Sequence, residues 1–212
     1  MFRAERLGDA AYDEIVALLH GGGIIAFPTD TAYGLAVDPS NNDGVDRLFR
    51  VKGRSETKPI LLLVDSLRMA ESISEPADVF YEVAEQFWPG PLTLILKAQP
   101  SVAVKVTAGT HTIGVRWPIA AFATTLIDRF ARPITATSAN RSGMQAAITV
   151  DEVRAQLDDA IDGVVDGGTL STRMGSTVLD LTVDPPSVLR EGPIRFEVLN
   201  QFFKGRLQKS LA

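Results

Sequence analysis

The stretch GGGIIAFPTDTAYG, residues 21–34, changes abruptly from small and apolar residues to polar ones, and it is the clearest indication of fold class in the sequence. Upstream, residues 8–20 carry apolar side chains at helical spacing, and the glycines that follow end this helix. The apolar run IIAF, residues 24–27, then predicts a buried strand, and Pro28 and Gly34 bracket a polar loop. A helix followed by a buried strand and a polar loop is typical of α/β proteins.

The same alternation continues along the chain. Further helices are predicted at 41–52, 76–87, 119–131 and 149–157, and further strands at 60–64, 92–98, 112–118, 133–138, 162–168, 176–182 and 187–192. Helices and strands alternate early and strands gather late, which indicates an α/β or mixed α+β fold: a single-domain twisted open sheet with flanking helices. We expect one domain over residues 1–212, with its core at about 12–198 and a C-terminal helix or tail at 199–212.

The composition excludes several classes of protein. Hydrophobic residues make up 45% and charged residues 22%, as in ordinary globular domains. The absence of cysteine excludes disulfides, thiolate metal sites and a cysteine nucleophile, and the sequence contains no P-loop motif. The net charge of −5 gives no general attraction to nucleic acid, and no segment is apolar enough to span a membrane. We therefore expect a soluble cytoplasmic protein without membrane contact.

Three polar clusters follow predicted strands, where the ligands of open α/β sheets tend to bind. The first cluster, PTDTAYG, offers hydroxyls and one carboxylate to a small polar ligand such as an amino acid, through Thr29, Asp30, Thr31 and Tyr33. The alternative is a turn in which the Asp and Thr side chains satisfy their own backbone.

The second cluster is VKGRSETKPI, which gathers Lys52, Arg54 and Lys58 before a buried strand. A bent loop could aim all three cations at one polyanion, with arginine as a bidentate phosphate clamp and lysine as a point charge. The alternative is a solvent-exposed loop in which Glu56 pairs with a lysine.

The third cluster is PITATSANRSG, where Thr137, Ser138 and Asn140 end a predicted strand. Hydroxyls, an amide and backbone N–H groups at such a turn can line a phosphate or a nucleoside. The alternative is that these residues cap the next helix, although Thr149 and Glu152 already have the capping-box spacing there.

Arg116 is the residue that most strongly indicates function. It lies in TIGVRWP, within the pattern of a buried strand, and arginine is seldom buried without a partner or a ligand carboxylate. Arg190, in SVLREG, is a weaker case of the same kind. Ser176 and Thr177 repeat the hydroxyl pattern at the start of a later strand.

Seven motifs occur in an order that resembles the YrdC/TsaC family, the L-threonylcarbamoyladenylate synthases. They are FPTDTAYGLAVDP, VKGRSETKPI, FWPGPLTLIL, TIGVRWP, TATSANRSG, DGGTLSTRMGSTVLDLT and VLREGPI, from about Gly22 to Ile194. The resemblance implies a twisted α/β sheet with a large, positively lined concave cavity. It also implies the reaction of L-threonine, bicarbonate and ATP to threonylcarbamoyl-AMP, diphosphate and water, the first step of tRNA threonylcarbamoyladenosine modification.

The resemblance also assigns site residues, position by position. The residues it places at threonine are Thr31, Tyr33, Arg116, Ala136 and Ser176. The residues it places at ATP are Lys52, Arg54, Lys58, Thr112, Ser138, Asn140, Ala146 and Arg190. Lys52 and Arg54 are expected to be catalytic by offsetting charge on the leaving diphosphate. Mg²⁺ is expected to come with the ATP phosphates, and Asp30 is a candidate ligand of the metal.

The sequence departs from the family pattern at three positions. Ser55 stands where a proline often follows the arginine, which predicts a more mobile loop. Leu63 stands where longer members often have a histidine, and Gly175 where a glutamate often precedes the serine; both affect threonine contact. The chain resembles the short, single-domain form of the family.

Two other functions compete with the synthase. A similar cavity could hold double-stranded RNA or a tRNA stem without catalysis, although only Lys204, Arg206 and Lys209 add local positive charge near the C-terminus. A related carbamoyl transferase would use carbamoyl phosphate, but the zinc-finger and acylphosphatase segments usual in such enzymes are not found here. The partners expected of a synthase are the tRNA threonylcarbamoyl transferase proteins that use its product.

Overall fold

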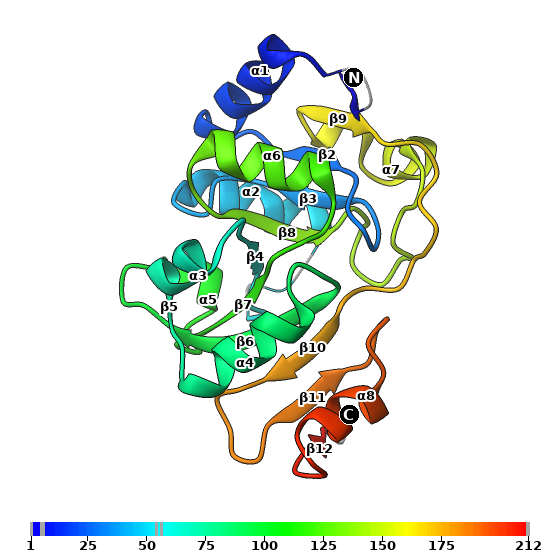
Figure 1. Ribbon diagram of the computed structural model, residues 1–212. Coiled ribbons are helices and arrows are strands. Elements are labelled where there is room, and N and C mark those ends of the chain that lie inside the picture. Colours follow the sequence, from blue (N-terminus) through cyan, green and yellow to red (C-terminus); the bar gives the residue numbers. More distant parts are fainter. Residues whose placement is uncertain (1, 5–6, 54, 56, 211–212) are drawn as a thin grey trace.

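The computed structural model describes residues 2–4, 7–53, 55 and 57–210. Arg54 and Glu56, both in the second polar cluster, lie outside the described residues. Within the described part of the chain, the strands join into one 12-stranded sheet, and helices pack on it (Figure 1). The predicted fold class, a single-domain mixed α/β sheet with flanking helices, is confirmed.

The elements follow the expected order. The strands are β1 (Phe2–Arg3), β2 (Ile25–Phe27), β3 (Gly34–Ala36), β4 (Leu61–Leu63), β5 (Ser74–Glu75), β6 (Leu92–Ala98), β7 (Thr112–Arg116), β8 (Ile134–Ser138), β9 (Gly163–Asp166), β10 (Thr177–Asp180), β11 (Ser187–Arg190) and β12 (Gln208–Lys209). The helices are α1 (Asp9–His20), α2 (Asn42–Lys52), α3 (Leu67–Ile73), α4 (Asp78–Phe87), α5 (Val104–Thr107), α6 (Ala121–Phe130), α7 (Val150–Leu157), the 3-10 helix η2 (Asp158–Ala160) and α8 (Phe196–Phe202). Each predicted range between residues 8 and 192 agrees with its element to within two residues at either end.

The C-terminal segment differs from the prediction of a helix or tail at 199–212. Helix α8 begins earlier, at Phe196, and ends at Phe202. Gln208 and Lys209 then pair with β11 as the short parallel strand β12. The described end of the chain is thus part of the sheet.

The sheet mixes parallel and antiparallel pairs. Its strand order is β1-β9-β2-β3-β8-β4-β7-β6-β10-β11-β12, and β5 pairs with β6. The pairs β2–β9, β4–β7 and β6–β10 are parallel, whereas β8 runs antiparallel to both of its neighbours, β3 and β4. β8 therefore joins two groups of strands into one continuous surface.

Alternating side chains of β2 supply two separate hydrophobic cores. Ile25 and Phe27 belong to a cluster with α1 and α6, to which Phe122 contributes. Ala26 belongs to a second, larger cluster that includes Leu48 of α2. Figure 1 shows α1 and α6 together near β2, β3 and β8, as the clusters require. Because successive side chains of a strand point to opposite faces, one short strand stabilises both layers.

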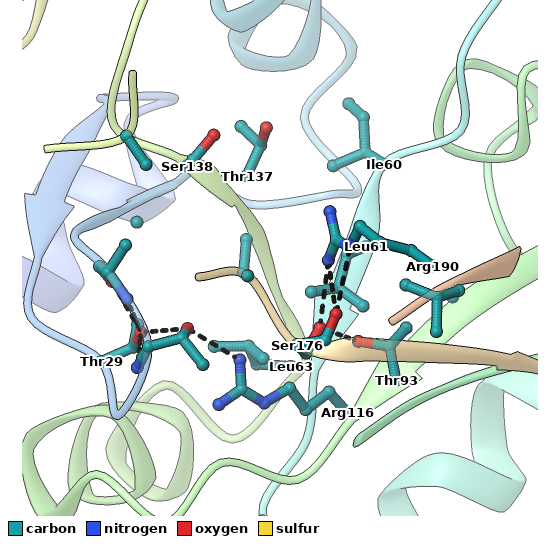
Figure 2. A pocket seen from close by; sticks show the side chains of 18 of the residues that line it. Thr29, Ile60, Leu61, Leu63, Thr93, Arg116, Thr137, Ser138, Ser176 and Arg190 are labelled. Carbon is teal, nitrogen blue, oxygen red and sulfur yellow. Dashed lines mark hydrogen bonds between the residues drawn. The ribbon is translucent and has the colours of Figure 1, made fainter. Parts of the chain in front are cut away.

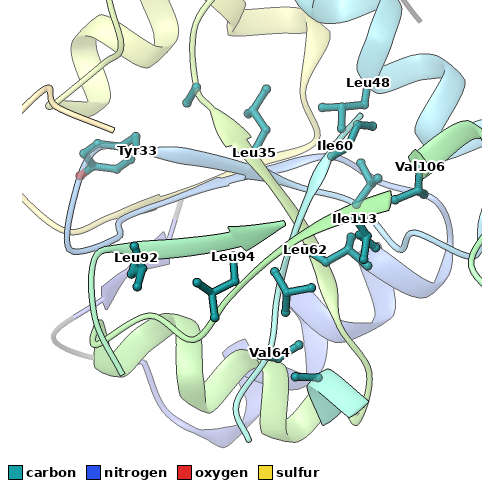
Figure 3. Packing of buried hydrophobic residues seen from close by; sticks show 14 of the residues in the cluster. Tyr33, Leu35, Leu48, Ile60, Leu62, Val64, Leu92, Leu94, Val106 and Ile113 are labelled. Atoms are coloured by element: carbon teal, nitrogen blue, oxygen red, sulfur yellow. The ribbon is translucent and has the colours of Figure 1, made fainter. Parts of the chain in front are cut away.

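One face of the central strands packs into the larger core, whereas the other lines a cavity and reaches the smaller core only through residues such as Leu63. Leu62 of β4, Leu94 of β6 and Ile113 of β7 are buried in the larger cluster (Figure 3). Their neighbours in sequence, Leu61 and Gly114 among them, lie on the opposite face and line a cavity. The alternation that builds the core therefore also provides the floor of this cavity.

Helix α7 begins at the residue that the capping-box spacing predicts. The hydroxyl of Thr149 accepts a hydrogen bond from the backbone N–H of Glu152, at 3.2 Å. The carboxylate of Glu152 accepts one from the backbone N–H of Ile148, at 2.9 Å, in place of the reciprocal bond to Thr149. The helix start thus holds the loop before it as well as the cap.

No helix within the described ranges is long and apolar enough to cross a bilayer.

The burial pattern of the strands predicts different losses of stability for two leucine substitutions. Leu62→Ala removes a side chain that is 1% exposed and should lower the free energy of unfolding by about 2–5 kcal/mol, because it leaves a cavity in a packed core. Leu189→Ala removes one that is 44% exposed and should cost less than about 1 kcal/mol. Urea unfolding followed by circular dichroism measures both, and equal losses would contradict the assignment of the two faces.

Candidate functional site

A cavity of about 430 Å³ lies on the open face of the central strands (Figure 2). Its floor comes from alternate residues of three strands: Leu61 and Leu63 of β4, Thr93 and Ile95 of β6, and Gly114 and Arg116 of β7. A Cβ on Gly114 would lie 3.3–3.4 Å from side-chain atoms of Ile95, Leu61 and Thr93. The absence of a side chain at this position therefore leaves space at the centre of the cavity floor. The volume is in the range of ligand pockets.

The charged residues of the described cavity lining are all arginines, although two of them pair with acids just outside the lining. Arg116, Arg173 and Arg190 all contribute to its wall, whereas no aspartate or glutamate does so among the described lining residues. Low-dielectric walls strengthen such a field, so the cavity favours an anionic ligand. This agrees with the positively lined concave cavity that the family resemblance implies.

Arg116 is held at the end of β7 and is only 3% exposed. Its Nε donates to the carbonyl of Gly90 at 3.0 Å, and its Nη1 donates to the hydroxyl of Thr31 at 3.1 Å. Its Nη2 lies 2.5 Å from Oδ2 of Asp30, so the buried cation has the partner that its burial demands. Burial lowers the pKa of Arg116, the carboxylate of Asp30 opposes this change, and the nearby charge of Arg190 adds to it.

The Arg116–Asp30 pair leaves one carboxylate oxygen unsatisfied. Oδ1 of Asp30 is buried and has no hydrogen bond among the described residues, whereas Oδ2 is the atom that pairs with Nη2 of Arg116. An unsatisfied buried polar group costs about 1–3 kcal/mol, and such a cost is usually explained by a role in binding. The pair therefore marks one end of the cavity as a polar binding site.

The loop after β2 brings hydroxyls to the same end. The hydroxyls of Thr29 and Thr31 lie 3.0 Å apart, and Thr29 Oγ1 also donates to the carbonyl of Ala32. Thr29 thus satisfies the backbone of its own turn, as the alternative interpretation expects, while the hydroxyl of Thr31 accepts a hydrogen bond from Arg116. The binding of a ligand by this cluster stays a prediction.

Tyr33 forms part of the cavity wall, but its hydroxyl is used elsewhere. It donates to the carbonyl of Gly168 at 2.8 Å and accepts from the N–H of Gly167 at 2.9 Å. Burial raises the pKa of the Tyr33 phenol, the hydrogen bond from Gly167 lowers it, and Asp166 raises it. Tyr33 thus fixes the loop after β9, and its fully buried side chain also belongs to the larger hydrophobic cluster behind the cavity.

Arg190 and Ser176 lie beside Arg116 at this end of the cavity (Figure 2). Nε and Nη2 of Arg190 both donate to the carbonyl of Ser176, at 3.0 and 2.9 Å. The hydroxyl of Ser176 is 2.6 Å from that of Thr93, so strands β6 and β10 share a buried hydroxyl pair. The structure therefore brings Arg190 and Ser176 together with Thr31 and Arg116, which the sequence predicted from separate motifs.

The loop after β8 is organised by Lys52 and Asn140. Nζ of Lys52, buried at the end of α2, donates to the carbonyls of Ser138 and Asn140. The amide of Asn140 donates to the carbonyls of Arg141 and Met144, and its Oδ1 is buried without a partner among the described residues. Ser138 and Asn140 line the cavity, whereas Lys52 lies behind this loop and is not part of the lining.

The remaining predicted residues lie at different distances from the cavity. Ala136 and Ala146 line it. Thr112, the first residue of β7, is on the same face of the strand as Gly114 and Arg116 but is outside the lining. Lys58 is exposed before β4 and is also outside the lining. Arg54 lies outside the described residues, so its role stays a prediction.

Arg173 is a cavity residue that the sequence reasoning missed. It lies in the loop between β9 and β10, and its guanidinium pairs with Glu152 at 2.5 and 2.6 Å. Nη1 also donates to the carbonyl of Ala146 at 2.8 Å. The signal was weak because a lone arginine in a loop has no strand pattern around it, and Glu152 already had a capping role.

The fold and the site together define a mixed α/β domain with an arginine-lined cavity on the open face of its sheet. The chain belongs to the Sua5/YciO/YrdC family: the family model, described as "Telomere recombination", matches residues 17–192. The resemblance seen in the seven sequence motifs is therefore confirmed.

Three relatives show how far the similarity extends. The chain is 37% identical over 191 residues to the threonylcarbamoyl-AMP synthase of Bacillus subtilis, covering 89% of this chain and 55% of the relative. The crystal structure of P. abyssi Sua5 complexed with L-threonine matches with a TM-score of 0.92 at 33% identity, covering 99% of this chain and 61% of that one. The solution structure of MTH1692 from Methanobacterium thermoautotrophicum matches with a TM-score of 0.71 at 38% identity, covering 92% and 93%. The chain thus spans between half and two thirds of the length of the first two.

The Arg173–Glu152 pair predicts an unusual titration. Hydrogen bonds from Arg173 and from the backbone of Ile148 lower the pKa of Glu152 from 4.5 to about 2. Because the folded-state pKa is the lower one, the pair stabilises the folded protein above about pH 4.5, and this contribution is lost as the pH falls towards about 2. A ¹³C NMR titration of the Glu152 carboxyl should give a midpoint near 2, and Arg173→Met should raise it. A midpoint near 4.5 in the unsubstituted protein would contradict the pair.

Proposed function

We propose that this chain is an L-threonylcarbamoyladenylate synthase. Its substrates would be L-threonine, bicarbonate or CO₂, and ATP, and its products threonylcarbamoyl-AMP, diphosphate and water. The proposal is supported by membership of the family, by the name of the Bacillus subtilis relative and by the threonine complex of the P. abyssi protein.

The environment of Arg116 is the observation that most directly supports the proposal. A buried guanidinium in the cavity wall, beside the hydroxyl of Thr31, suits the carboxylate of a small hydroxylated amino acid. The unsatisfied Oδ1 of Asp30 adds an acceptor near the same point. We propose Thr31, Arg116 and Ser176 as polar contacts of threonine, with the ring of Tyr33 and the methyl of Ala136 as walls.

The nucleotide would occupy the rest of the cavity. The polar turn with Ser138 and Asn140 and the backbone at Ala146 line that part, and Arg190 lies between it and the threonine end. Thr112 and Lys58, just outside the lining, would be reached by the phosphate chain of a larger ligand. Lys52 would act chiefly by holding the carbonyls of Ser138 and Asn140, so that the turn keeps its shape.

The chemistry requires positioning and charge stabilisation and no protein nucleophile. The protonated amine of threonine and bicarbonate would form a carbamate, releasing water and one proton. A carbamate oxygen would then attack the α-phosphorus of ATP, and the bond from that phosphorus to the diphosphate oxygen would break. Arg190 and the cations of the second polar cluster would offset the charge that develops on diphosphate.

The described residues do not fit a metal ion held by the protein. No group of three acidic or imidazole side chains that could hold one occurs in the described ranges. Asp30, the candidate ligand, pairs with Arg116 instead. Mg²⁺ would therefore belong to the ATP substrate, and none of the steps above goes through it.

The product would need an acceptor because acyl adenylates hydrolyse readily. We propose that tRNA threonylcarbamoyl transferase proteins take it up and that the protein works in the cytoplasm. Direct contact with tRNA or double-stranded RNA has weak electrostatic support at a net charge of −5.

Replacing Arg116 tests the proposed function. Threonine-dependent release of diphosphate from ATP, with bicarbonate present, should lose about a hundredfold in kcat/KM for threonine in Arg116→Met, because a buried charged partner of the substrate is removed. Arg195→Met, which changes an exposed arginine paired with Glu191, is the matched control and should keep full activity. A folded Arg116→Met variant with unchanged activity would contradict the proposal, as would an unsubstituted protein that releases no diphosphate.

The phosphate role assigned to Arg54 has its own test. Arg54→Ala should lower threonine-dependent diphosphate release from ATP by about tenfold or more, because a charge-assisted contact to phosphate is lost. The KM for threonine should stay near its original value, since Arg116 is untouched. Full activity of Arg54→Ala would show that the phosphate clamp is formed by other cations.

A further inference from the structure

Gly175 lies directly against the guanidinium of Arg190. Both residues line the cavity. A Cβ built on Gly175 would lie 2.9 Å from Nη2, 3.0 Å from Cζ and 3.2 Å from Nη1 of Arg190. These separations are shorter than van der Waals contact, so the guanidinium occupies the space that any side chain at position 175 would fill.

The backbone beneath this contact is held from its other side. A Cβ on Gly192 would lie 2.5 Å from the carbonyl oxygen of Gly175 and 2.6 Å from the carbonyl carbon of Ser176, so the two backbone segments touch. The N–H of Gly192 also donates to the hydroxyl of Thr177 at 2.9 Å. Crowding at position 175 therefore cannot be relieved by the backbone, and the flexible side chain of Arg190 has to move instead.

Arg190 differs from the other two cavity arginines in its charge balance. Arg116 pairs with Asp30, and Arg173 pairs with Glu152. Arg190 has no ion pair with a carboxylate in the part of the chain that the structure describes; it is held by hydrogen bonds to Ser176 alone. Figure 2 shows these bonds on one side of the guanidinium, with a nitrogen on the other side directed away from Ser176. Its charge is thus available to an anion in the cavity.

We propose that Gly175 is a positioning residue that sets the place of the Arg190 guanidinium for a phosphate group of the nucleotide. The inference rests on the proposed function, in which Arg190 contacts ATP. Without a side chain at position 175, the guanidinium lies against the Gly175–Ser176 backbone, and two parallel bonds to one carbonyl fix its orientation. A methyl group at position 175 would move the Arg190 guanidinium away from Ser176. It would also displace the guanidinium nitrogen that points away from Ser176 and would contact the phosphate.

The first experiment compares Gly175→Ala with Gly8→Ala. A Cβ on Gly8 would meet nothing within 4 Å, and the φ of Gly8 is −79°, so this control makes the same chemical change in open space. The Kd of ATP, measured by titration calorimetry without threonine, should rise about tenfold in Gly175→Ala and stay unchanged in Gly8→Ala. The thermal unfolding midpoint should be close to that of the unsubstituted protein in both. A markedly lower midpoint for Gly175→Ala would show that the backbone has yielded, and it would overturn the proposal.

A double-mutant cycle shows whether the effect passes through Arg190. Arg190→Met should weaken ATP binding, and adding Gly175→Ala to it should weaken binding no further. An equal loss from Gly175→Ala in both backgrounds would overturn the proposal.

An NMR measurement keeps this inference separate from the proposed function. The ¹H–¹⁵N resonance of Arg190 Nε, which donates to the Ser176 carbonyl, should shift in Gly175→Ala and not in Gly8→Ala, with no ligand present. An unchanged resonance would overturn the positioning role even if ATP binds. Failure of the unsubstituted protein to bind ATP, with the resonance shifted as expected, would count against the proposed function and against a phosphate as the partner of Arg190.

Discussion

The alternation of side chains along the central strands is the constraint on which both the core and the cavity depend. Leu62, Leu94 and Ile113 bury one face of β4, β6 and β7, and their sequence neighbours form the cavity floor on the other. A shift of one residue in strand register would exchange the two faces. Such a shift of β7 would place Arg116 in the apolar core and Ile113 and Val115 in the cavity. The register that stabilises the fold is therefore the register that forms the site.

Prediction from sequence succeeded where a physical pattern extends over several residues. Strands such as 92–98 have enough apolar residues to show their period, whereas β1, β5 and β12 have two residues each and no period to detect. Among the residues assigned to the site, those found in the cavity lining are Thr31, Tyr33, Arg116, Ala136, Ser138, Asn140, Ala146, Ser176 and Arg190. A local sequence pattern does not determine where the end of a long side chain lies. Lys52 was expected among the phosphates, but its ammonium group is held by two carbonyls behind the turn.

The three cavity arginines are held in three different ways, and this difference separates the two ends of the site. Arg116 is buried and paired with Asp30. Arg173 is paired with Glu152 at the rim. Arg190 has no carboxylate partner among the described residues and is held by the backbone and hydroxyl of Ser176. The proposed threonine end and the proposed nucleotide end thus differ in how the charge of their arginine is balanced.

The Arg173–Glu152 tie also has a mechanical consequence. It links the loop before β10 to the start of α7, and the bond from Arg173 to the carbonyl of Ala146 draws the turn after β8 into the same unit. Two walls that are distant in sequence are thus fastened together, so neither can swing outward alone. High salt, or a pH low enough to protonate Glu152, would weaken this exposed ion pair and so loosen the connection between the two walls.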